Sequence, residues 1–296
     1  MNNLNTKFAF FGSSRLSVIV LDELGKLGLV PQFIVTTCDK PVGRKQIITP
    51  NVVKVWAQEK NITCLDPQKL DDDFIKKIKD LNTKDGVEIC PVFLVASYGK
   101  ILPKNLIEIP SKKTLNIHPS LLPQYRGASP LPTTILEDTK NTGVSIMIID
   151  QEMDHGPLVA QKTITINNWT PYDDFEEYMA REGALLFAEV LEKWINGEIE
   201  PKEQDHSLAT YTKKFSKEDA LIDLNGDAYT NWRKIQAFDG WLGCYFVINR
   251  NGKTLRVKIT EARFENNKLE ILKVIPEGSK EMSFADFERG YNVTHS

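Results

Sequence analysis

The sequence of 296 residues is poor in cysteine and has no long apolar run. Its four cysteines are dispersed and form no C-x-x-C pair, which argues against a disulfide framework and favours reduced thiols in a cytoplasmic protein. No apolar stretch approaches the length of a membrane span, and the polar first residues do not resemble a signal peptide. We therefore expect no membrane partner.

An excess of charge of one sign is also lacking. The formal net charge of −3 excludes the overall basic signature of many nucleic-acid-binding proteins. From residue 207 onward basic side chains slightly outnumber acidic ones, which is a weak hint of an anionic partner, although a solvated surface of mixed charge is the simpler explanation. Apolar residues at 41% and charged residues at 26% are typical of a folded globular chain.

Strands and helices alternate along the first two thirds of the chain. This order predicts an α/β fold with a doubly wound, mostly parallel sheet covered by helices on both faces. The turn at Gly12-Ser13-Ser14 has no G-x-G-x-x-G pattern, so a dinucleotide fingerprint is absent, and both a tight turn and a ligand contact stay open there. The clearest predicted elements are strands at 8–11, 32–37, 92–96, 115–117 and 144–149, and helices at 16–27, 70–81 and 172–196.

The pattern changes after a polar stretch at 198–207. Short β-branched or alternating runs at 246–248, 254–260 and 269–274 are separated by turn-like residues, and a short helix is expected near 229–238. We predict a first domain over 1–197, a linker over 198–207, and a small C-terminal β-barrel domain over 208–296.

A dense polar segment begins at Asn116 and His118. Residues two apart on a strand point to the same side, so these two side chains should share one face. Pro119 ends the strand, because proline cannot donate to a ladder and restricts the residue before it. The amide and the imidazole then lie at the carboxyl end of a strand, where open α/β sheets bind ligands.

An amide N–H and an imidazole aimed at one point can stabilise an oxyanion, and the histidine can move a proton. No serine or cysteine nearby has a nucleophile-elbow pattern. The pair therefore indicates direct acyl transfer through a tetrahedral intermediate. From these residues alone, a hydrogen-bonded structural role for His118 stays open.

A second polar run, from Asp150 to Gly156, follows the strand at 144–149. Parallel strands end at the same edge of a sheet, so we expect Asp154 to reach the same pocket and to orient His118. The acidic and histidine residues of this run also suggest a metal site, but their spacing matches no ligand template, so we expect no metal.

The segment from Asn116 to Pro123, with Tyr125-Arg126-Gly127, resembles the signature of the folate-dependent formyltransferase family. Met153-Asp154-His155-Gly156 is similar to the loop with that family's catalytic aspartate. The resemblance implies that Asn116, His118 and Asp154 are catalytic, with 10-formyltetrahydrofolate as co-substrate. The family more often has threonine at the position of His155, so the resemblance assigns no role to His155.

The resemblance also implies a folate pocket. Its residues come from a segment that follows the strand at 92–96 and from the segment after His118. They are Tyr98, Gly99, Ile101 and Leu102, and Ser120, Leu121, Leu122 and Pro123.

The loop from Asp39 to Pro50 is similar to an insertion that touches the acceptor end of tRNA in the family. The resemblance thus implies tRNA contacts by Lys40, Arg44, Lys45 and Arg126, although Arg44 also reads as a solvated loop charge. Segments around 217–223, 235–246 and 276–284 resemble the family's OB-like barrel domain. Two departures are Gln236, where arginine is usual, and Trp241-Leu242-Gly243 in place of a turn with proline.

The resemblance implies a monomeric enzyme that formylates the α-amine of methionyl initiator tRNA in translation initiation. A formyltransferase for an amino-sugar nucleotide would share the catalytic residues, but the 39–50 loop and the barrel favour tRNA. An RNA-binding protein on a decayed scaffold is a different reading, against which the intact catalytic residues argue. A folate hydrolase would need water in place of an amine, and the sequence does not decide that point.

Overall fold

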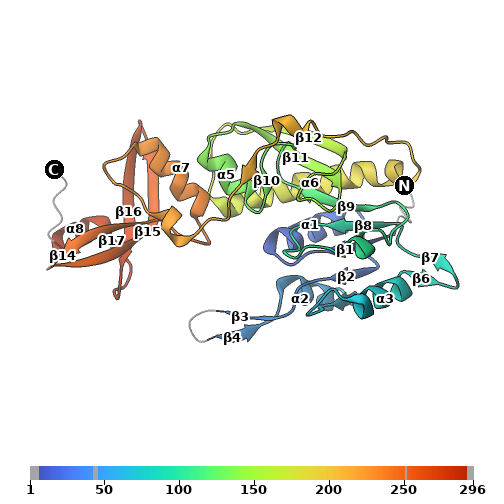
Figure 1. Ribbon diagram of the computed structural model, residues 1–296. Helices are drawn as coiled ribbons and strands as arrows, with labels where there is room; N and C mark the ends of the chain where they lie inside the picture. Colours follow the sequence, from blue (N-terminus) through green and yellow to red (C-terminus); the bar gives the residue numbers. More distant parts are fainter. Residues whose placement is uncertain (1–6, 43–45, 251, 292–296) are drawn as a thin grey trace. The chain divides into compact units, whose positions relative to one another are not determined.

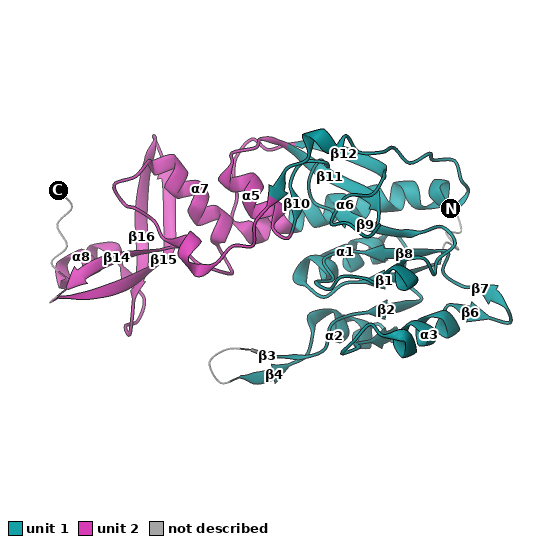
Figure 2. Ribbon diagram, in the orientation of Figure 1, with its two compact units in different colours: residues 1–127, 142–164, 177–211 teal, residues 128–141, 165–176, 212–296 magenta. Residues whose placement is uncertain are grey.

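The computed structural model describes residues 7–42, 46–250 and 252–291, and its contacts divide the chain into two units (Figure 2). Unit 1 comprises residues 1–127, 142–164 and 177–211, and unit 2 comprises residues 128–141, 165–176 and 212–296. The expected domain boundary therefore differs from the grouping of contacts: two segments before residue 197 belong with the C-terminal part, and the expected linker belongs to unit 1. The domain boundaries stay a prediction.

Unit 1 contains a seven-stranded sheet with the order β12-β11-β9-β8-β1-β2-β5 (Figure 1). β1 pairs in parallel with β2 and β8, β8 pairs in parallel with β9, and β2 with β5, whereas β11 is antiparallel to β9. The mostly parallel sheet is thus confirmed. The strands are β1 (Phe8–Phe11), β2 (Phe33–Val35), β5 (Thr63–Leu65), β8 (Val92–Val95), β9 (Thr114–His118), β11 (Asn141–Ile148) and β12 (Leu158–Thr165).

Helices cover both faces of this sheet. Alternate residues of β1 and β8, such as Phe11 and Phe93, form a buried cluster with Phe74 and Ile78 of α3. Phe8 points to the other face, where its ring meets Phe187 of α6 at 5.6 Å between centroids. The helices that begin in unit 1 are α1 (Arg15–Lys26), α2 (Val52–Glu59), α3 (Asp72–Leu81) and α4 (Lys104–Ile107); α6 (Tyr172–Ile195) begins in unit 2 and continues into unit 1.

Side-chain caps explain where three of these helices begin. Ser14, Asn51 and Asp71 stand before α1, α2 and α3, and each side chain accepts a hydrogen bond from a backbone N–H of the first turn. Gly12 precedes the first of them in a tight turn. A Cβ at Gly12 would lie 2.5 Å from the Phe10 ring and 2.6 Å from Ser17 Oγ, so packing alone requires glycine there.

Two short hairpins were not expected from the sequence. They consist of very short, largely exposed strands that lack a buried apolar face, so no alternation marks them. Their strands are β3 (Lys40–Val42) with β4 (Ile47–Thr49), and β6 (Thr83–Lys84) with β7 (Val87–Glu88).

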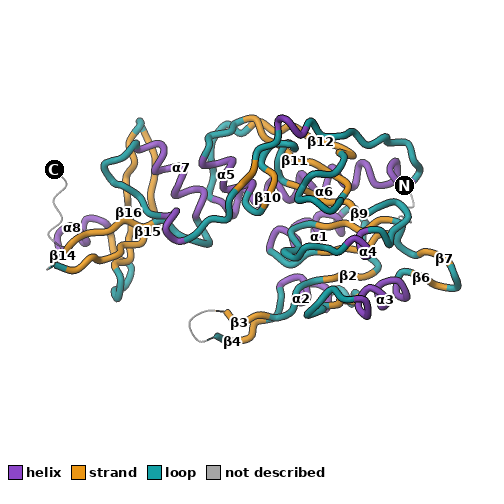
Figure 3. Tube along the Cα trace, in the orientation of Figure 1, coloured by secondary structure: helices purple, strands orange, loops and turns teal. Residues whose placement is uncertain are grey.

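Unit 2 contains a four-stranded antiparallel sheet with the order β14-β15-β16-β17, which agrees with the mainly antiparallel C-terminal part expected (Figure 3). Phe238 of α7 and Phe246, Val257 and Val274 of the sheet are buried. The elements are α5 (Pro130–Leu136), α7 (Ala228–Phe238), β14 (Tyr245–Arg250), β15 (Lys253–Glu265), β16 (Lys268–Pro276), β17 (Met282–Ser283) and α8 (Phe284–Tyr291).

Short pieces complete the chain: β10 (Arg126–Gly127), β13 (Tyr211–Thr212) and the 3-10 turns at His206–Leu208 and Lys217–Ala220. Across the three described ranges, no helix is both long enough and apolar enough to span a bilayer.

Candidate active site

Strand β9 positions Asn116 and His118 on the same face of the sheet. Ile117, between them, packs against α6, where a Cβ on Gly183 would lie 2.5 Å from its Cγ2 atom. Because neighbours on a strand point to opposite faces, Asn116 and His118 project away from α6. The strand ends at His118 and Pro119 follows, so the predicted placement of the pair is found.

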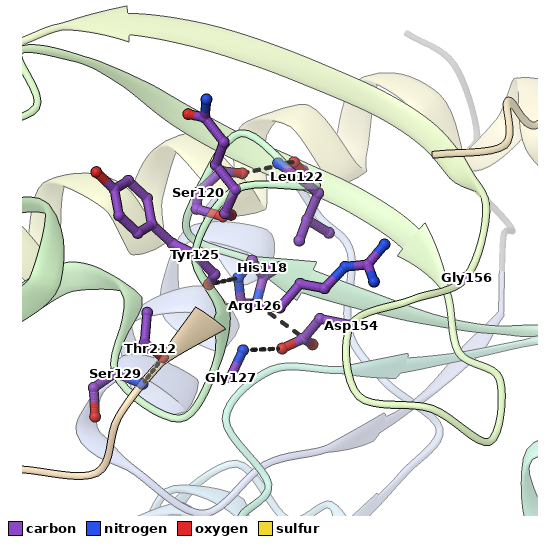
Figure 4. Close-up of polar contacts among 12 residues, drawn as sticks. His118, Ser120, Leu122, Tyr125, Arg126, Gly127, Ser129, Asp154, Gly156 and Thr212 are labelled. Carbon is purple, nitrogen blue, oxygen red and sulfur yellow. Dashed lines mark hydrogen bonds and ion pairs between the residues drawn. The ribbon is translucent and has the colours of Figure 1, made fainter. Parts of the chain in front are cut away.

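The imidazole of His118 is buried and faces an oxygen at each nitrogen (Figure 4). Its Nε2 lies 2.9 Å from the Tyr125 carbonyl oxygen, which can only accept, so Nε2 carries the proton of that hydrogen bond. Its Nδ1 lies 3.5 Å from Oδ1 of Asp154. That separation is longer than an ordinary N–H···O bond, so Nδ1 has room to serve a third atom as well.

Asp154 reaches His118 as expected, but the expected reason is wrong. β11 runs antiparallel to β9, with Ser145 opposite His118 and Ile148 opposite Leu115. The end of β11 therefore lies near the beginning of β9, and the loop 149–157 turns back to bring Asp154 to His118. There the Asp154 Oδ2 accepts a hydrogen bond of 2.8 Å from the backbone N–H of Gly127.

The Asn116 side chain is the open polar group of the site. It is partly exposed, and among the described residues its amide makes no hydrogen bond. His118 and Asp154, by contrast, are held by neighbours. An amide with unused donors beside a proton-carrying imidazole can bind a negatively charged oxygen.

The two segments expected to bind folate follow β8 and β9, which are adjacent parallel strands. Ile101 is 86% exposed, and Leu102 and Leu121 are partly exposed, so this edge offers apolar surface to a flat ring. Gly99 is exposed with a φ of 76°, a left-handed backbone that suits glycine.

The remaining expected folate residues serve the scaffold. Ser120 is fully buried, and its hydroxyl donates to the Gln124 carbonyl. The backbone N–H of Leu122, a buried residue, donates to Ser145, and a cis peptide joins Leu122 to the partly exposed Pro123. Tyr98 belongs to the core cluster under α3, and burial raises the pKa of its hydroxyl. These side chains shape the two loops more than they line a surface.

The expected contacts with tRNA have different outcomes. Lys40 is exposed on β3, whereas Arg44 and Lys45 lie outside the described residues. The expectation for Arg126 is corrected, because its side chain is only 1% exposed. Its guanidinium donates to Gln204, to His206 and, at 3.4 Å, to Tyr211. A side chain so enclosed cannot meet a phosphate at the surface.

Sequence reasoning missed Gln204, His206 and Tyr211, the partners of Arg126. All three lie in or beside the polar stretch expected to be a linker. The sequence offered only an indirect signal. Arg126 lies in the segment that resembles the family signature, and a buried arginine needs hydrogen-bond acceptors. Nothing in the sequence says which segment supplies them.

His155, another titratable group of unit 1, has structural partners. His155 Nδ1 lies 2.7 Å from Asp150 Oδ2, and its ring stacks on His206 at 4.0 Å. Within the ranges that the structure describes, no three His, Cys, Asp or Glu residues are grouped to hold a metal ion. Burial raises the pKa of the Cys90 thiol to about 12, which makes it a poor nucleophile.

Comparisons with known proteins agree with this architecture. Residues 6–191 match the family described as formyl transferase, and residues 214–270 match its C-terminal domain. The methionyl-tRNA formyltransferase of Thermodesulfovibrio yellowstonii is 33% identical over 309 aligned positions, which cover 98% of this chain and 97% of that protein. The one from Thermotoga neapolitana is 35% identical over 256, covering 85% and 78%.

Two solved structures share the fold at lower identity. Methionyl-tRNA formyltransferase from Clostridium thermocellum matches with a TM-score of 0.60 and 16% identity, covering 94% of this chain and 99% of that one. An N-formyltransferase from Helicobacter canadensis, in complex with folinic acid and dTDP-3-aminofucose, matches with a TM-score of 0.59 and 18% identity, covering 90% and 95%. At these identities the likeness concerns the fold alone.

Proposed function

Because the chain belongs to the formyl transferase family, we propose that it transfers a formyl group from 10-formyltetrahydrofolate to the α-amine of methionyl initiator tRNA. The observation that carries this proposal is the open amide of Asn116 on the same face as the His118–Asp154 pair. The relatives named methionyl-tRNA formyltransferase support the choice of acceptor, since one of them aligns with nearly the whole chain.

Asn116 and His118 stabilise the negative charge that develops on the formyl oxygen when the amine attacks. The Asn116 amide donates directly, since no neighbour among the described residues uses its N–H groups. His118 donates from Nδ1, because its Nε2 proton is held by the Tyr125 carbonyl. One such donor is worth on the order of 3 kcal/mol of the barrier.

Asp154 takes part in the proton transfers of the reaction. A C–N bond forms between the amine and the formyl carbon, and the C–N bond to the folate nitrogen breaks. The amine loses one proton, and the folate nitrogen takes one up. The Asp154 carboxylate, which lies 3.5 Å from His118 Nδ1, can accept the proton of the amine. The pair then returns a proton to the leaving nitrogen.

The folate is a substrate, which supplies the formyl group. The edge formed by the loops after β8 and β9 fits a flat heteroaromatic molecule, because exposed Ile101 and the partly exposed Leu102 and Leu121 offer apolar contacts. The loop after β1 lies beside the loop after β8, where Ser13 Oγ donates to the Tyr98 carbonyl at 2.7 Å. The strand order changes direction between β1 and β8, the place where open sheets bind ligands.

For the tRNA, we propose contacts from Lys40, which is exposed on β3, and from Arg44 and Lys45, which follow β3 in the sequence. Unit 2, which includes the match to the family's C-terminal domain, provides a further surface for the tRNA. We further propose a monomer that acts in the cytoplasm, where charged initiator tRNA is found.

The test is a direct assay. The purified chain is mixed with 10-formyltetrahydrofolate and methionyl initiator tRNA, and formylmethionyl-tRNA is separated by acid gel electrophoresis. We expect formylation that Asn116→Ala abolishes. Parallel reactions with dTDP-linked amino sugars test the alternative acceptor. Formylation of an amino sugar without formylation of tRNA would replace the acceptor, and release of formate alone would indicate a folate hydrolase.

A further inference from the structure

Arg126 and Gln204 form a buried polar contact next to the loop that carries Asp154. Arg126 is the largest fully buried side chain among the described residues, and Gln204 is 5% exposed. Gln204 Oε1 accepts from Arg126 Nη2 at 2.7 Å and from Nε at 3.3 Å. A guanidinium only donates, so the oxygen of the Gln204 amide must face Arg126 and the nitrogen must face away.

The amide nitrogen of Gln204 holds the loop that carries Asp154. Its Nε2 donates to the Asp154 carbonyl at 3.0 Å and to the Gly156 carbonyl at 2.7 Å. Both amide protons and the amide oxygen are therefore used. Since Arg126 fixes the orientation of the amide, the donors point at the two carbonyls of the loop with no freedom to flip.

The residues around Gln204 also hold the loop of Tyr125, whose carbonyl oxygen faces His118 Nε2. We call residues 202–211 the strap. Thr210 accepts from the Arg126 N–H through its carbonyl and from the Tyr125 N–H through its hydroxyl, at 2.9 and 2.8 Å. Its own N–H donates to the Pro123 carbonyl. One segment thus fixes the Tyr125 carbonyl, which binds His118 Nε2, and the loop of Asp154, which faces His118 Nδ1.

We infer that Gln204 is a positioning residue, which sets the distance between Asp154 and His118 by holding the backbone of the Asp154 loop. The inference rests on the proposed catalytic role of Asp154. The physical reason is that the carboxylate has little support from its own segment. β11 runs away from the site, and the donor to the carboxylate, the Gly127 N–H, comes from another loop. Asp154 also has a left-handed φ of 52°. The strap, whose residues 202–207 fall within the stretch expected to be a linker, is therefore part of the catalytic apparatus.

Two substitutions separate positioning from mere stability. Gln204→Glu keeps an acceptor for Arg126 but replaces the donor with an oxygen that repels both carbonyls. Gln204→Ala removes both interactions and leaves a buried guanidinium short of an acceptor. We expect Gln204→Glu to fold and to lose about 10-fold or more in kcat, with KM for folate and tRNA changed less than about 3-fold. Gln236→Ala is the matched control, since Gln236 is a buried glutamine in α7 of unit 2.

The second readout does not require turnover. The chain has four histidines, so the ring-nitrogen signals of the 15N-histidine-labelled protein can be assigned by single replacements. We expect Gln204→Glu to change the Nδ1 signal of His118 in the same direction as Asp154→Asn does, and Gln236→Ala to leave it unchanged. In the double variant, Gln204→Glu should add less than about 3-fold to the loss of kcat caused by Asp154→Asn.

The outcomes separate the two proposals. If Gln204→Glu has the kcat and the His118 signal of the unsubstituted protein, or if its loss of kcat adds fully to that of Asp154→Asn, the positioning role is overturned. If the protein transfers no formyl group but the His118 signal responds to Gln204→Glu, the proposed function fails and the positioning of Asp154 by Gln204 stands.

Discussion

Two aspartates, Asp138 in unit 2 and Asp154 in unit 1, have similar backbones and different surroundings. Both have a left-handed φ, 56° and 52°. Asp138 Oδ1 accepts hydrogen bonds from Trp169 Nε1 at 2.7 Å and from Tyr229 Oη at 2.9 Å, and it pairs with Lys140 at 3.2 Å. Asp154 accepts from one backbone N–H and faces His118 at 3.5 Å.

Burial does not tell a carboxylate that is saturated by donors from one that has spare acceptor capacity. The Asp154 side chain is 14% exposed and that of Asp138 is 35% exposed, so the more enclosed group has the fewer fixed donors. Burial raises the pKa of Asp138, but the hydrogen bonds from Trp169, Tyr229 and Lys140 outweigh it, so the pKa lies below its ordinary value. A carboxylate saturated by donors stabilises the fold, whereas one with spare capacity can take part in chemistry.

The largest effect that we expect is a loss of activity without a loss of stability when Asp154 is replaced. Asp154→Asn keeps an acceptor for the Gly127 N–H but removes the charge that faces His118, so we expect kcat to fall at least ~100-fold with folding intact. Asn116→Ala should cause a similar loss, because it removes an oxyanion donor. Steady-state kinetics and thermal unfolding check both. Near-normal turnover in either variant would remove that residue from the catalytic assignment.

The next effect concerns the support behind Asp154. Arg126→Ala leaves Gln204 Oε1 and His206 Nδ1 without their buried donor and creates a cavity, so we expect a loss of about 2–3 kcal/mol in the free energy of unfolding. Urea denaturation measures it. Lys40→Ala, at an exposed site on β3, is the control and should change stability by less than about 0.5 kcal/mol. Equal losses in the two variants would contradict a buried role for Arg126.

At Asp138 the effect should be one of stability alone. Asp138→Ala removes the partner of the Trp169 and Tyr229 donors, so we expect a loss of about 1–2 kcal/mol near neutral pH and a kcat within about 2-fold of the unsubstituted value. The cost should depend on pH. A carboxyl whose pKa is lower in the folded state stabilises above its unfolded pKa, near 3.9, and this part is lost as the pH falls through the folded pKa.

The stability difference between Asp138→Ala and the unsubstituted protein should therefore be largest near pH 6 and should shrink below about pH 4. Urea unfolding of the two proteins across this range measures it. A difference that grows as the pH falls, or a large loss of kcat, would show that Asp138 is more than a structural carboxylate.

The smallest effect is expected at Arg44, which lies outside the described residues and far in the sequence from both aspartates. Arg44→Ala should weaken the apparent affinity for tRNA a few-fold at low salt and should lower the salt dependence of KM, because one phosphate contact releases about one counterion. Kinetics at two salt concentrations test this. An unchanged salt dependence would leave the contact between this loop and tRNA without support.

The sequence correctly predicted the sheet and the strand end that carry Asn116 and His118. Alternation along β9 and the proline after it placed Asn116 and His118 on one face at a strand end, and the structure has them there. The alternation of strands and helices predicted a sheet covered on both faces, and the structure has α3 on one face and α6 on the other. These inferences depend on periodicity and on local backbone restriction, which are properties of short runs of neighbouring residues.

The short hairpins and the origin of Asp154 were not predicted. Two-residue strands such as β6 and β7 have no buried face, and hence no pattern to detect. A strand's direction in the sheet leaves no mark on its own residues, so β11 was taken as parallel and the right contact was expected for the wrong reason.

By itself, the sequence determined the chemical groups of the site and the strand that bears two of them, because side-chain type and local periodicity are properties of neighbouring residues. Only the tertiary structure decided that Asp154 arrives from an antiparallel strand, that Arg126 is buried, and that Gln204 connects the two. The hydrogen bonds that join Asp154 to Gly127, and Gln204 to Arg126 and to Asp154, connect residues 27 to 78 positions apart in the sequence. Their geometry depends on which segments the folded chain brings together, and no local pattern records that.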